Sequence, residues 1–215
     1  MALRETNLDK LDGGSFDVLI VGGGINGAVS AAALSARGAS VALIDRGDFA
    51  GFTSQESSNL VWGGIKYLEN YEFPLVRKLC MSRNRLMRAY PANVKEIGFL
   101  GVLGETAPFP PWVVGVGAFA YWGIGNFKTN APRPMSPETV ERIEPIINTV
   151  GTVGGIEYAD AYLKDNDARF VFSFIRSAMD VGAVAANYVE LENAERVKGN
   201  WHAQLRDCES GMPIN

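Results

Sequence analysis

The sequence predicts an α/β fold that opens on a strand, a glycine-rich turn, a helix and a second strand. The first observation is the short apolar run at 18–21, which is typical of a strand buried in a parallel sheet. The second is the pattern Gly-x-Gly-x-x-Gly that follows it, at Gly22, Gly24 and Gly27. The third is another apolar run, at 41–44, which ends in an acid. Together they predict a Rossmann-like unit.

The three glycines of the turn are expected to have different roles. Gly22 allows the tight turn, Gly24 lets a pyrophosphate approach the backbone, and Gly27 lets the helix lie close to the strand. The alanine-rich segment 26–37 predicts that helix, and Gly38 is placed to end it.

The acid after the second strand predicts a dinucleotide site. Asp45 follows Gly22 by 45 − 22 = 23 positions, near the roughly 20 expected for a carboxylate that binds a ribose hydroxyl. The helix N-terminus offers free N–H groups and a positive dipole to the pyrophosphate. An acid favours the unphosphorylated ribose of FAD or NAD over that of NADP. The alternative is a glycine turn needed only for packing.

Composition excludes several other classes of protein. The 215 residues suffice for one large domain or two small ones, and 47% hydrophobic with 20% charged residues fits a globular chain. A net charge of −4 gives no broad basic surface for nucleic acid. Two cysteines cannot form a disulfide framework and fit a reducing compartment. We expect residues 1–15 to be a short lead-in without a signal peptide, and we predict no metal site.

A loop and a basic helix are expected next. The hydroxyl-rich segment 46–72 could donate hydrogen bonds to phosphate oxygens, or could be an ordinary serine-rich loop. Residues 73–90 predict a helix with one apolar face. Its basic residues fall largely elsewhere, and a solvated face is favoured over one that meets anionic lipid or a phosphorylated substrate. These residues are Arg77, Lys78, Arg83, Arg85 and Arg88.

The middle of the chain departs from the α/β pattern. The apolar window 112–124 is shorter than the roughly 20 residues of a spanning helix. We favour a buried segment of a second domain over a position at a membrane surface, which Trp112, Tyr121 and Trp122 would suit. A short helix is expected to begin at Ser136 and to end before Pro145.

The α/β pattern returns near the C-terminus. We expect a strand at 154–159, a helix capped by Asp165 or Asn166 that ends before Gly182, and a strand at 184–191. A hairpin at 197–206 would turn at Gly199 and Asn200.

The order of these blocks resembles the FAD-dependent glycerol-3-phosphate dehydrogenases, within the wider D-amino-acid-oxidase-like superfamily. The likeness runs from Phe16 to Pro213. Its most specific block is LIDRGDFAGFTSQESSNLVWGGIKYLENYEF, with DVLIVGGGINGA before it and GGIEYADAYLKDNDARFVF after it. The resemblance implies a Rossmann-like FAD-binding domain of the glutathione-reductase type, formed by residues 1–80 and 152–215. Residues 81–151 would be an inserted cap or substrate region.

The resemblance also implies an activity. It implies a flavoprotein of glycerol metabolism that oxidises sn-glycerol 3-phosphate to dihydroxyacetone phosphate and passes the electrons to quinone. It implies a cytoplasmic protein that is peripheral on the inner face of the cytoplasmic membrane. A polyol phosphate is the implied substrate, and a homodimer is kept as a candidate assembly.

Site residues follow from the matching positions. The resemblance assigns the FAD pyrophosphate to the glycine turn, the adenosine ribose to the acid with its basic neighbour, the phosphates and flavin to the hydroxyl-rich segment, and adenine to the last strand. The implied cofactor-binding residues are Gly22, Gly24, Ile25, Asn26, Gly27, Asp45, Arg46, Thr53, Ser54, Ser57, Ser58, Leu60, Gly63, Gly64 and Leu191. Lys66 and Tyr67 would face the substrate.

The chain also departs from the family pattern. Trp62 stands where the family has His, Lys66 where it has Arg, and Asn59 where it has Lys. Lys66 keeps the cation but lacks the bidentate fork for phosphate. Another polyol phosphate or a related hydroxy acid therefore stays open as substrate, as does an amine or hydroxy-acid oxidase of the same fold.

The family's chains are longer, so we expect an N-terminal fragment. A non-catalytic flavin-binding remnant is a further alternative. No catalytic residue is identified, and the single histidine, His202, is expected at the surface.

Overall fold

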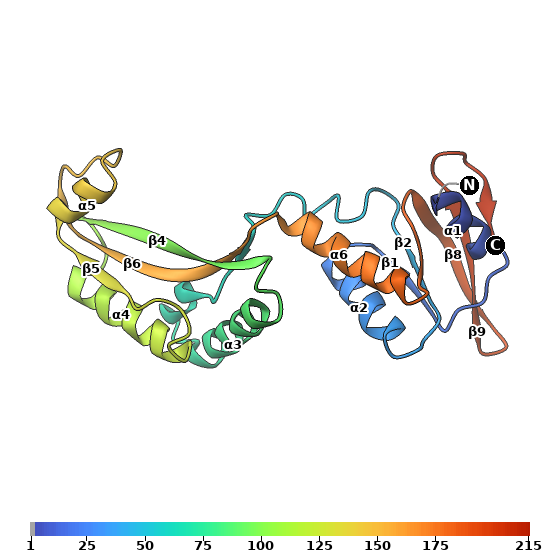
Figure 1. Ribbon diagram of the computed structural model, residues 1–215, viewed down its shortest axis with the longest axis horizontal. Coiled ribbons are helices and arrows are strands. Elements are labelled where there is room, and N and C mark those ends of the chain that lie inside the picture. Colours follow the sequence, from blue (N-terminus) through green and yellow to red (C-terminus); the bar gives the residue numbers. More distant parts are fainter. Residues whose placement is uncertain (1–2) are drawn as a thin grey trace. The chain divides into compact units, whose positions relative to one another are not determined.

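The computed structural model describes residues 3–215 (Figure 1). The chain folds into two compact units. Unit 1 contains the residues up to Ser58 together with Asp165–Asn215, and unit 2 is Asn59–Lys164. Figure 1 shows the elements of each unit, coloured along the sequence from blue at the N-terminus to red at the C-terminus.

A parallel sheet forms the centre of unit 1. Its strands are β1 (Val18–Val21), β2 (Val41–Ile44) and β7 (Val184–Ala186), in the order β1-β2-β7. The helices α2 (Ile25–Ser35) and α6 (Asp167–Asp180) pack against each other. The predicted α/β class with a parallel sheet is confirmed.

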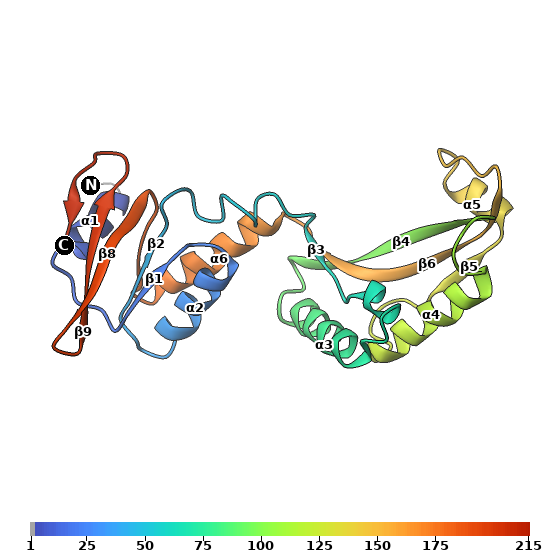
Figure 2. The same cartoon turned by 180° about the vertical axis from the view of Figure 1, so that it is seen from behind.

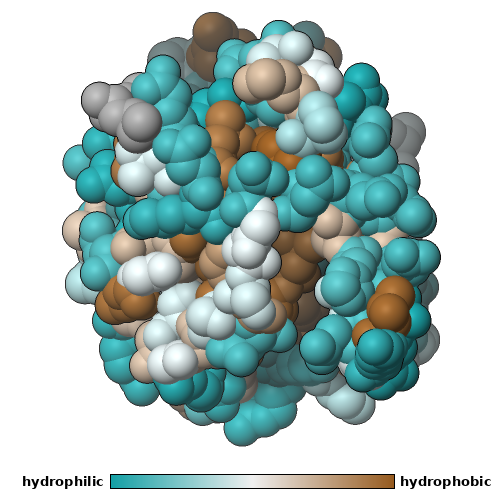
Figure 3. All heavy atoms as spheres, turned by 90° about the vertical axis from the view of Figure 1, so that its right-hand side faces the viewer, coloured by the Kyte–Doolittle hydropathy of each residue, from teal (hydrophilic) through white to brown (hydrophobic). Residues whose placement is uncertain are grey.

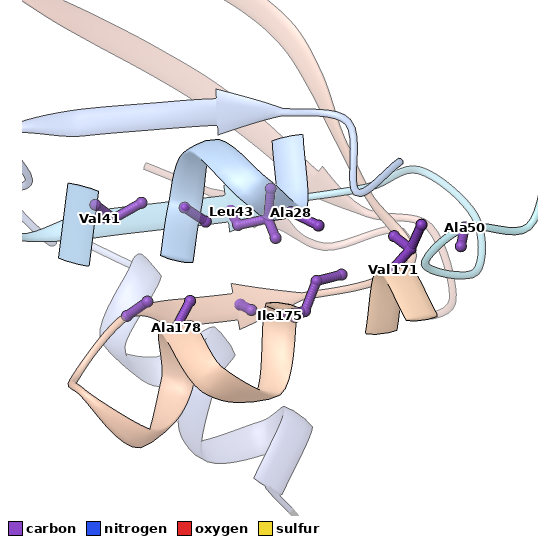
Figure 4. Packing of buried hydrophobic residues seen from close by; sticks show 10 residues of the cluster. Ala28, Val41, Leu43, Ala50, Val171, Ile175 and Ala178 are labelled. Carbon is purple, nitrogen blue, oxygen red and sulfur yellow. The ribbon is translucent and has the colours of Figure 1, made fainter. Parts of the chain in front are cut away.

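The middle strand β2 is buried on both faces, which explains its uninterrupted apolar run. Val41 and Leu43 point into a cluster that α2 and α6 complete, with the other labelled side chains of Figure 4. Ala42 and Ile44 point the opposite way, into a second cluster with Leu205 and its neighbours. The sheet is therefore the middle layer of three.

An antiparallel sheet and a helix form the third layer. The sheet has the order β10-β9-β8, from β8 (Val189–Val197), β9 (Asn200–Asp207) and β10 (Pro213–Ile214). The end of unit 1 that carries these strands shows a mainly hydrophilic surface with separate apolar patches (Figure 3).

The helix α1 (Leu3–Leu11) lies in the segment that the sequence indicated only as a short lead-in to the first strand. Its side chains are mostly polar, so no apolar stripe indicated a helix. Asn7 donates to the carbonyl of Ala185 at 2.9 Å, and Arg4 pairs with Asp207 and Glu209. Long-range polar contacts therefore hold α1 in place, although its local sequence pattern does not indicate a helix.

Two predictions near the C-terminus were wrong in detail. The strand expected at 184–191 is broken, because Tyr188 has a φ of +54° and the chain passes there from β7 to β8. The hairpin turns at Lys198 and Gly199, both with positive φ, and not at Gly199 and Asn200. Asn200 instead pairs with Val197 as the first residue of β9, as a two-residue turn with two left-handed residues requires.

Unit 2 is an antiparallel sheet covered on one face by helices. The long strand β6 (Thr152–Leu163) lies between β4 (Val94–Gly104) and the short strands β3 (Leu60–Val61) and β5 (Arg133–Met135). The helices α3 (Phe73–Ala89) and α4 (Pro111–Ile124) lie on the same side of this sheet (Figure 2). The 3-10 helix η1 (Ile65–Leu68) and α5 (Pro137–Ile143) complete the unit.

The boundaries of unit 2 differ from those predicted for the inserted region. We predicted 81–151, whereas the compact unit is 59–164. The reason is β6, which pairs with β4 from Thr152 to Leu163 and with β3 near its end. The segments 59–80 and 152–164 are thereby tied to the middle of the chain. Which segment binds which ligand stays a prediction.

The apolar window at 112–124 is buried on one face only. Gly115, Ala118 and Tyr121 of α4 are buried, whereas Trp112 is 71% and Val116 62% exposed. Within residues 3–215, no helix has both the length and the apolar character needed to cross a bilayer.

Ser35 of α2 provides a test of the packing in unit 1. Its hydroxyl is buried and has no hydrogen-bond partner among residues 3–215. We expect Ser35→Ala to leave the free energy of unfolding unchanged or to raise it by up to about 1 kcal/mol, because it removes an unpaired buried polar group. Urea unfolding measures this, with Ser30→Ala on the exposed side of α2 as the control. A clear loss of stability would show that the hydroxyl has a partner.

The ion pair between Arg4 of α1 and Asp207 at the end of β9 predicts a pH dependence. Burial alone would raise the pKa of Asp207, but hydrogen bonds from Ser210 and Arg4 outweigh it and lower that pKa from 3.8 to about 2. The stabilising contribution of this carboxylate is therefore complete above pH 3.8 and is lost as the pH falls toward 2.

We expect Asp207→Asn to flatten the fall in stability over that window, measured by urea unfolding at a series of pH values. The control is Glu209→Gln, which removes the more exposed partner of Arg4. Parallel curves for the wild type and Asp207→Asn would contradict this assignment.

Candidate functional site

The glycine turn of unit 1 lies between the end of β1 and the start of α2. Gly22 has a φ of +108°, and Gly24 is the N-cap residue of α2. A Cβ built on either of these residues meets no atom within 4 Å, so the space beside them is open. A Cβ on Gly27 would lie 1.9 Å from the carbonyl oxygen of Gly22, so the helix and the turn are in close contact there.

This geometry presents the first amide groups of α2 to open space. They have no partner within the helix, and the helix dipole adds positive potential at this end. An anion is the ligand that such an arrangement binds best. Ile25 and Asn26, which begin α2, are both exposed.

Asp45 binds the turn itself. Its carboxylate accepts from the Gly23 amide at 2.7 Å and from the Gly47 amide at 2.9 Å, and the side chain is buried. A carboxylate has about four acceptor positions, so capacity remains for a hydroxyl donor. Reasoning from the sequence assigned Asp45 to a ribose only and missed this bond to the glycine turn.

The segment after Asp45 covers one side of the turn. A Cβ on Gly23 would lie 2.4 Å from the ring of Phe49, and the Ala50 amide donates to the Gly23 carbonyl at 3.1 Å. Arg46 is exposed, and its guanidinium lies 5.6 Å from the ring centre of Phe52. Phe49 was also missed, since an aromatic residue in a loop carries no periodic signal.

The hydroxyl-rich segment is only partly available to a ligand. Thr53 and Ser58 are exposed, and Ser54 is half-buried. The Ser57 hydroxyl donates to the carboxylate of Asp167 at the start of α6. Leu191 packs half-buried against the cluster below the parallel sheet.

The remaining predicted residues lie in unit 2, around a buried ion pair. Asp160 of β6 and Arg83 of α3 are 0% and 2% exposed, with 3.0 Å between Nη1 of Arg83 and the carboxylate. The hydroxyl of Tyr121 from α4 donates to the other carboxylate oxygen at 2.8 Å. The Gly63 amide donates to both oxygens, at 3.0 and 3.1 Å. Four segments thus meet at one carboxylate.

The rest of this cluster is also paired. Arg83 donates to the Asn84 side chain at 3.2 and 3.1 Å, and Asn84 donates to the Gly125 carbonyl at 2.7 Å. Burial and the charge of Asp160 raise the pKa of Tyr121, so its hydroxyl stays a donor. Burial likewise raises the pKa of the Cys80 thiol.

Arg83 corrects one prediction. It was grouped with the basic residues of a solvated face, but it is buried and paired with Asp160. Two signals could have indicated this pair: the lone acid in the apolar segment 158–163, and an arginine three positions after the apolar Cys80. His202 is exposed on β9, as expected.

The two glycines of unit 2 occupy a crowded turn. Gly64 has a φ of +81° and is the N-cap residue of η1, which carries Lys66 and Tyr67. Lys66 is exposed, whereas Tyr67 is half-buried with its ring centre 5.9 Å from that of Trp62. Leu60, in β3, is exposed. The structure thus brings Gly63, Gly64, Lys66 and Tyr67 together within unit 2, and the glycine turn, Asp45 and Arg46 together within unit 1.

Comparisons with known proteins agree with this architecture. A family model described as FAD dependent oxidoreductase matches residues 17–211. A glycerol-3-phosphate dehydrogenase of Pseudomonas aeruginosa is 36% identical over 199 residues, which are 92% of this chain and 37% of that protein. A D-erythritol 1-phosphate dehydrogenase of Brucella abortus is 33% identical over 196 residues, 91% of this chain and 38% of that protein. The chain therefore spans well under half the length of these curated relatives.

Solved structures show the same fold. A glycerol-3-phosphate dehydrogenase from Bacillus halodurans, complexed with FAD, matches 98% of this chain and 34% of its own with a TM-score of 0.68 and 20% identity. A glycine oxidase from Geobacillus kaustophilus matches 93% of this chain and 52% of its own with a TM-score of 0.65 and 16% identity. The family model covers most of the chain, so this chain belongs to the FAD dependent oxidoreductase family.

Proposed function

We propose that the chain is the FAD-binding part of an enzyme that oxidises a polyol phosphate, with sn-glycerol 3-phosphate as substrate and dihydroxyacetone phosphate as product. The observation that carries the proposal is the open glycine turn, which is fixed by the hydrogen bond from the Gly23 amide to the Asp45 carboxylate. The relatives named for glycerol 3-phosphate and D-erythritol 1-phosphate support a polyol phosphate as the substrate class.

The residues of unit 1 fit FAD. The amides of Gly24, Ile25 and Asn26 would hold its pyrophosphate, because the space beside Gly22 and Gly24 is open and the helix end is positive. The remaining acceptor capacity of Asp45 would bind the ribose hydroxyls. Thr53, Ser54 and Ser58 would donate to the phosphates, and Leu191 would contact adenine. Ser57 would contribute less than predicted from the sequence, because its hydroxyl is engaged with Asp167.

The residues of unit 2 would contact the flavin ring and bind the substrate. FAD, when bound, accepts the hydride from the carbinol carbon of the substrate. The backbone of Gly63 and Gly64 would lie beside the flavin ring, and Lys66 would bind the substrate phosphate as a point charge. The hydroxyl proton of the substrate must pass to a base, which is not identified among the residues of this chain.

The electron acceptor and the cellular site are part of the same proposal. Quinone would take the electrons at the inner face of the cytoplasmic membrane. The exposed Trp112 and Val116 of α4 support contact with a membrane surface, because Trp is favoured at the lipid–water interface. A homodimer would be compatible with this arrangement.

One observation favours a second function. Trp62 is half-buried against Tyr67 where the family has a histidine, so it cannot act as a base or as a histidine-type link to flavin. Trp62, together with Lys66, motivates an amine or hydroxy-acid oxidase of the same fold as the second candidate.

The experiment is to purify the protein expressed from its complete reading frame and to record its visible spectrum. Bleaching of a flavin band by glycerol 3-phosphate, with transfer to a quinone analogue, is the expected result. Oxygen consumption with amino acids or hydroxy acids would favour the oxidase instead. A flavin that no substrate bleaches would favour a non-catalytic binding protein.

Asp45→Asn tests the cofactor site. The carboxamide has one acceptor oxygen, so either Gly23 or Gly47 loses its hydrogen bond and the turn is less well fixed. We expect the dissociation constant for FAD to rise at least about tenfold, which corresponds to about 1.4 kcal/mol. Flavin fluorescence titration measures it, with Asp9→Asn on the exposed side of α1 as the control. An unchanged constant would remove Asp45 from the site.

Lys66 tests the substrate end. We expect Lys66→Met to raise KM for the polyol phosphate roughly tenfold with a smaller change in kcat, because one charge-assisted contact is lost. Lys66→Arg should lower KM, because a guanidinium binds phosphate in a bidentate manner. Steady-state kinetics decide this, with the exposed Lys95→Met of β4 as the control. Equal KM values in all four proteins would place the phosphate elsewhere.

A further inference from the structure

We infer that Asp160, Arg83 and Tyr121 are positioning residues that fix the Gly63–Gly64 turn and thereby place Lys66 for its anionic ligand. The inference rests on the proposed function for the identity of that ligand, a polyol phosphate. None of the three side chains needs to touch the substrate. They act through the backbone of the turn.

Side chains from two elements converge on the backbone of a single residue, Gly63. The Gly63 amide donates to both oxygens of Asp160, and the Gly63 carbonyl accepts from the Cys80 thiol at 3.6 Å. The peptide groups on both sides of Gly63 are therefore held by side chains from β6 and α3. Tyr121 and Arg83 also bind each other, with 3.1 Å between Nη1 of Arg83 and the tyrosine hydroxyl, so both are linked to the carboxylate that holds Gly63.

The turn also has no room for a side chain at either glycine. A Cβ on Gly63 would lie 2.0 Å from the Tyr121 hydroxyl. A Cβ on Gly64 would lie 2.7 Å from Leu79, and the φ of +81° there already favours glycine. Gly63 is thus required by its contact with Tyr121, and Gly64 by its contact with Leu79 and by its backbone conformation.

The glycine turn is directly connected to Lys66. Gly64 caps η1, and the Tyr67 amide donates to the Gly64 carbonyl at 3.0 Å. Lys66 lies within this single turn and points its charge toward solvent, so its place depends on where the turn begins. A shift of about 1 Å in a group that positions substrate can cost about 100-fold in rate.

Stability alone is a weak reason for this cluster. A buried ion pair can often be replaced by apolar residues of the same volume without loss of stability, because desolvation offsets the attraction. Charge-assisted hydrogen bonds do add a defined orientation for each partner. Arg83 and Tyr121 orient the Asp160 carboxylate, and this carboxylate in turn orients the Gly63 amide.

Tyr121→Phe is the decisive variant, because it removes one hydroxyl and keeps the ring. Replacement of Asp160 would leave Arg83 buried without its charge partner and could unfold unit 2. Tyr162→Phe, on the same strand as Asp160, is the matched control. In the full-length protein we expect Tyr121→Phe to raise KM for the polyol phosphate about tenfold, with a smaller change in kcat and none in the control.

A double-mutant cycle separates positioning from general destabilisation. If Tyr121 acts through Lys66, Tyr121→Phe adds little to the KM of Lys66→Met, so the two effects are not additive. Additive effects, or an unchanged KM in Tyr121→Phe, would overturn the inference while the proposed function stands.

A second readout does not need catalysis. Inorganic phosphate is titrated against the labelled protein, and the amide signals of Gly64 and Lys66 are followed by NMR. We expect the dissociation constant to rise about tenfold in Tyr121→Phe and to stay unchanged in Tyr162→Phe. If no polyol phosphate is oxidised but this pattern holds, the proposed function fails and the inference stands. Equal dissociation constants for phosphate in the wild type and Tyr121→Phe, or no response of the wild type to phosphate, overturn the inference.

Discussion

The hydrogen bond from the Gly23 amide to the Asp45 carboxylate, 2.7 Å long, is the contact on which the account of unit 1 depends. It joins the turn after β1 to the end of β2, the two neighbouring strands of the parallel sheet. The turn is thereby fixed with open space beside Gly22 and Gly24, where α2 begins. A helix N-terminus that is held open in this way is suited to a diphosphate, and the family to which the chain belongs is defined by such a cofactor.

A similar arrangement recurs in unit 2 with different chemistry. There the Asp160 carboxylate accepts from the Gly63 amide, Arg83 balances its buried charge, and the Tyr121 hydroxyl donates a hydrogen bond to it. In unit 1 an acid just after a strand, and in unit 2 an acid within a strand, binds the backbone of a glycine turn. In each case the acid is buried, and its hydrogen bond fixes the backbone of the turn.

Much of unit 1 could be predicted because its signals are local. Four-residue apolar runs, three spaced glycines and an acid define β1, α2 and β2 with errors of one or two residues. Helix caps behaved similarly: Asn166 caps α6 by accepting from the Arg169 amide at 2.8 Å, and Ser136 caps α5. Where local chemistry decides the structure, the sequence suffices.

The remainder depended on contacts between distant residues. Helix α1 is held by Arg4 and Asn7 through residues about 180 to 200 positions away, so its own pattern is weak. The extent of unit 2 depends on the pairing of β6 with β4, which no single segment reveals. The pair of Arg83 and Asp160 spans 77 positions and looks like two ordinary charges in the sequence. The residues that a site needs for support are therefore harder to predict than those of its glycine motif.

The most direct measurement is the NMR response of backbone amides when FAD is added to the protein. The account predicts that the largest shifts fall on the amides of Gly24, Ile25 and Asn26, because these groups face the open side of the turn. Tight binding of FAD with those amides unshifted would contradict it, since the diphosphate would then lie somewhere else.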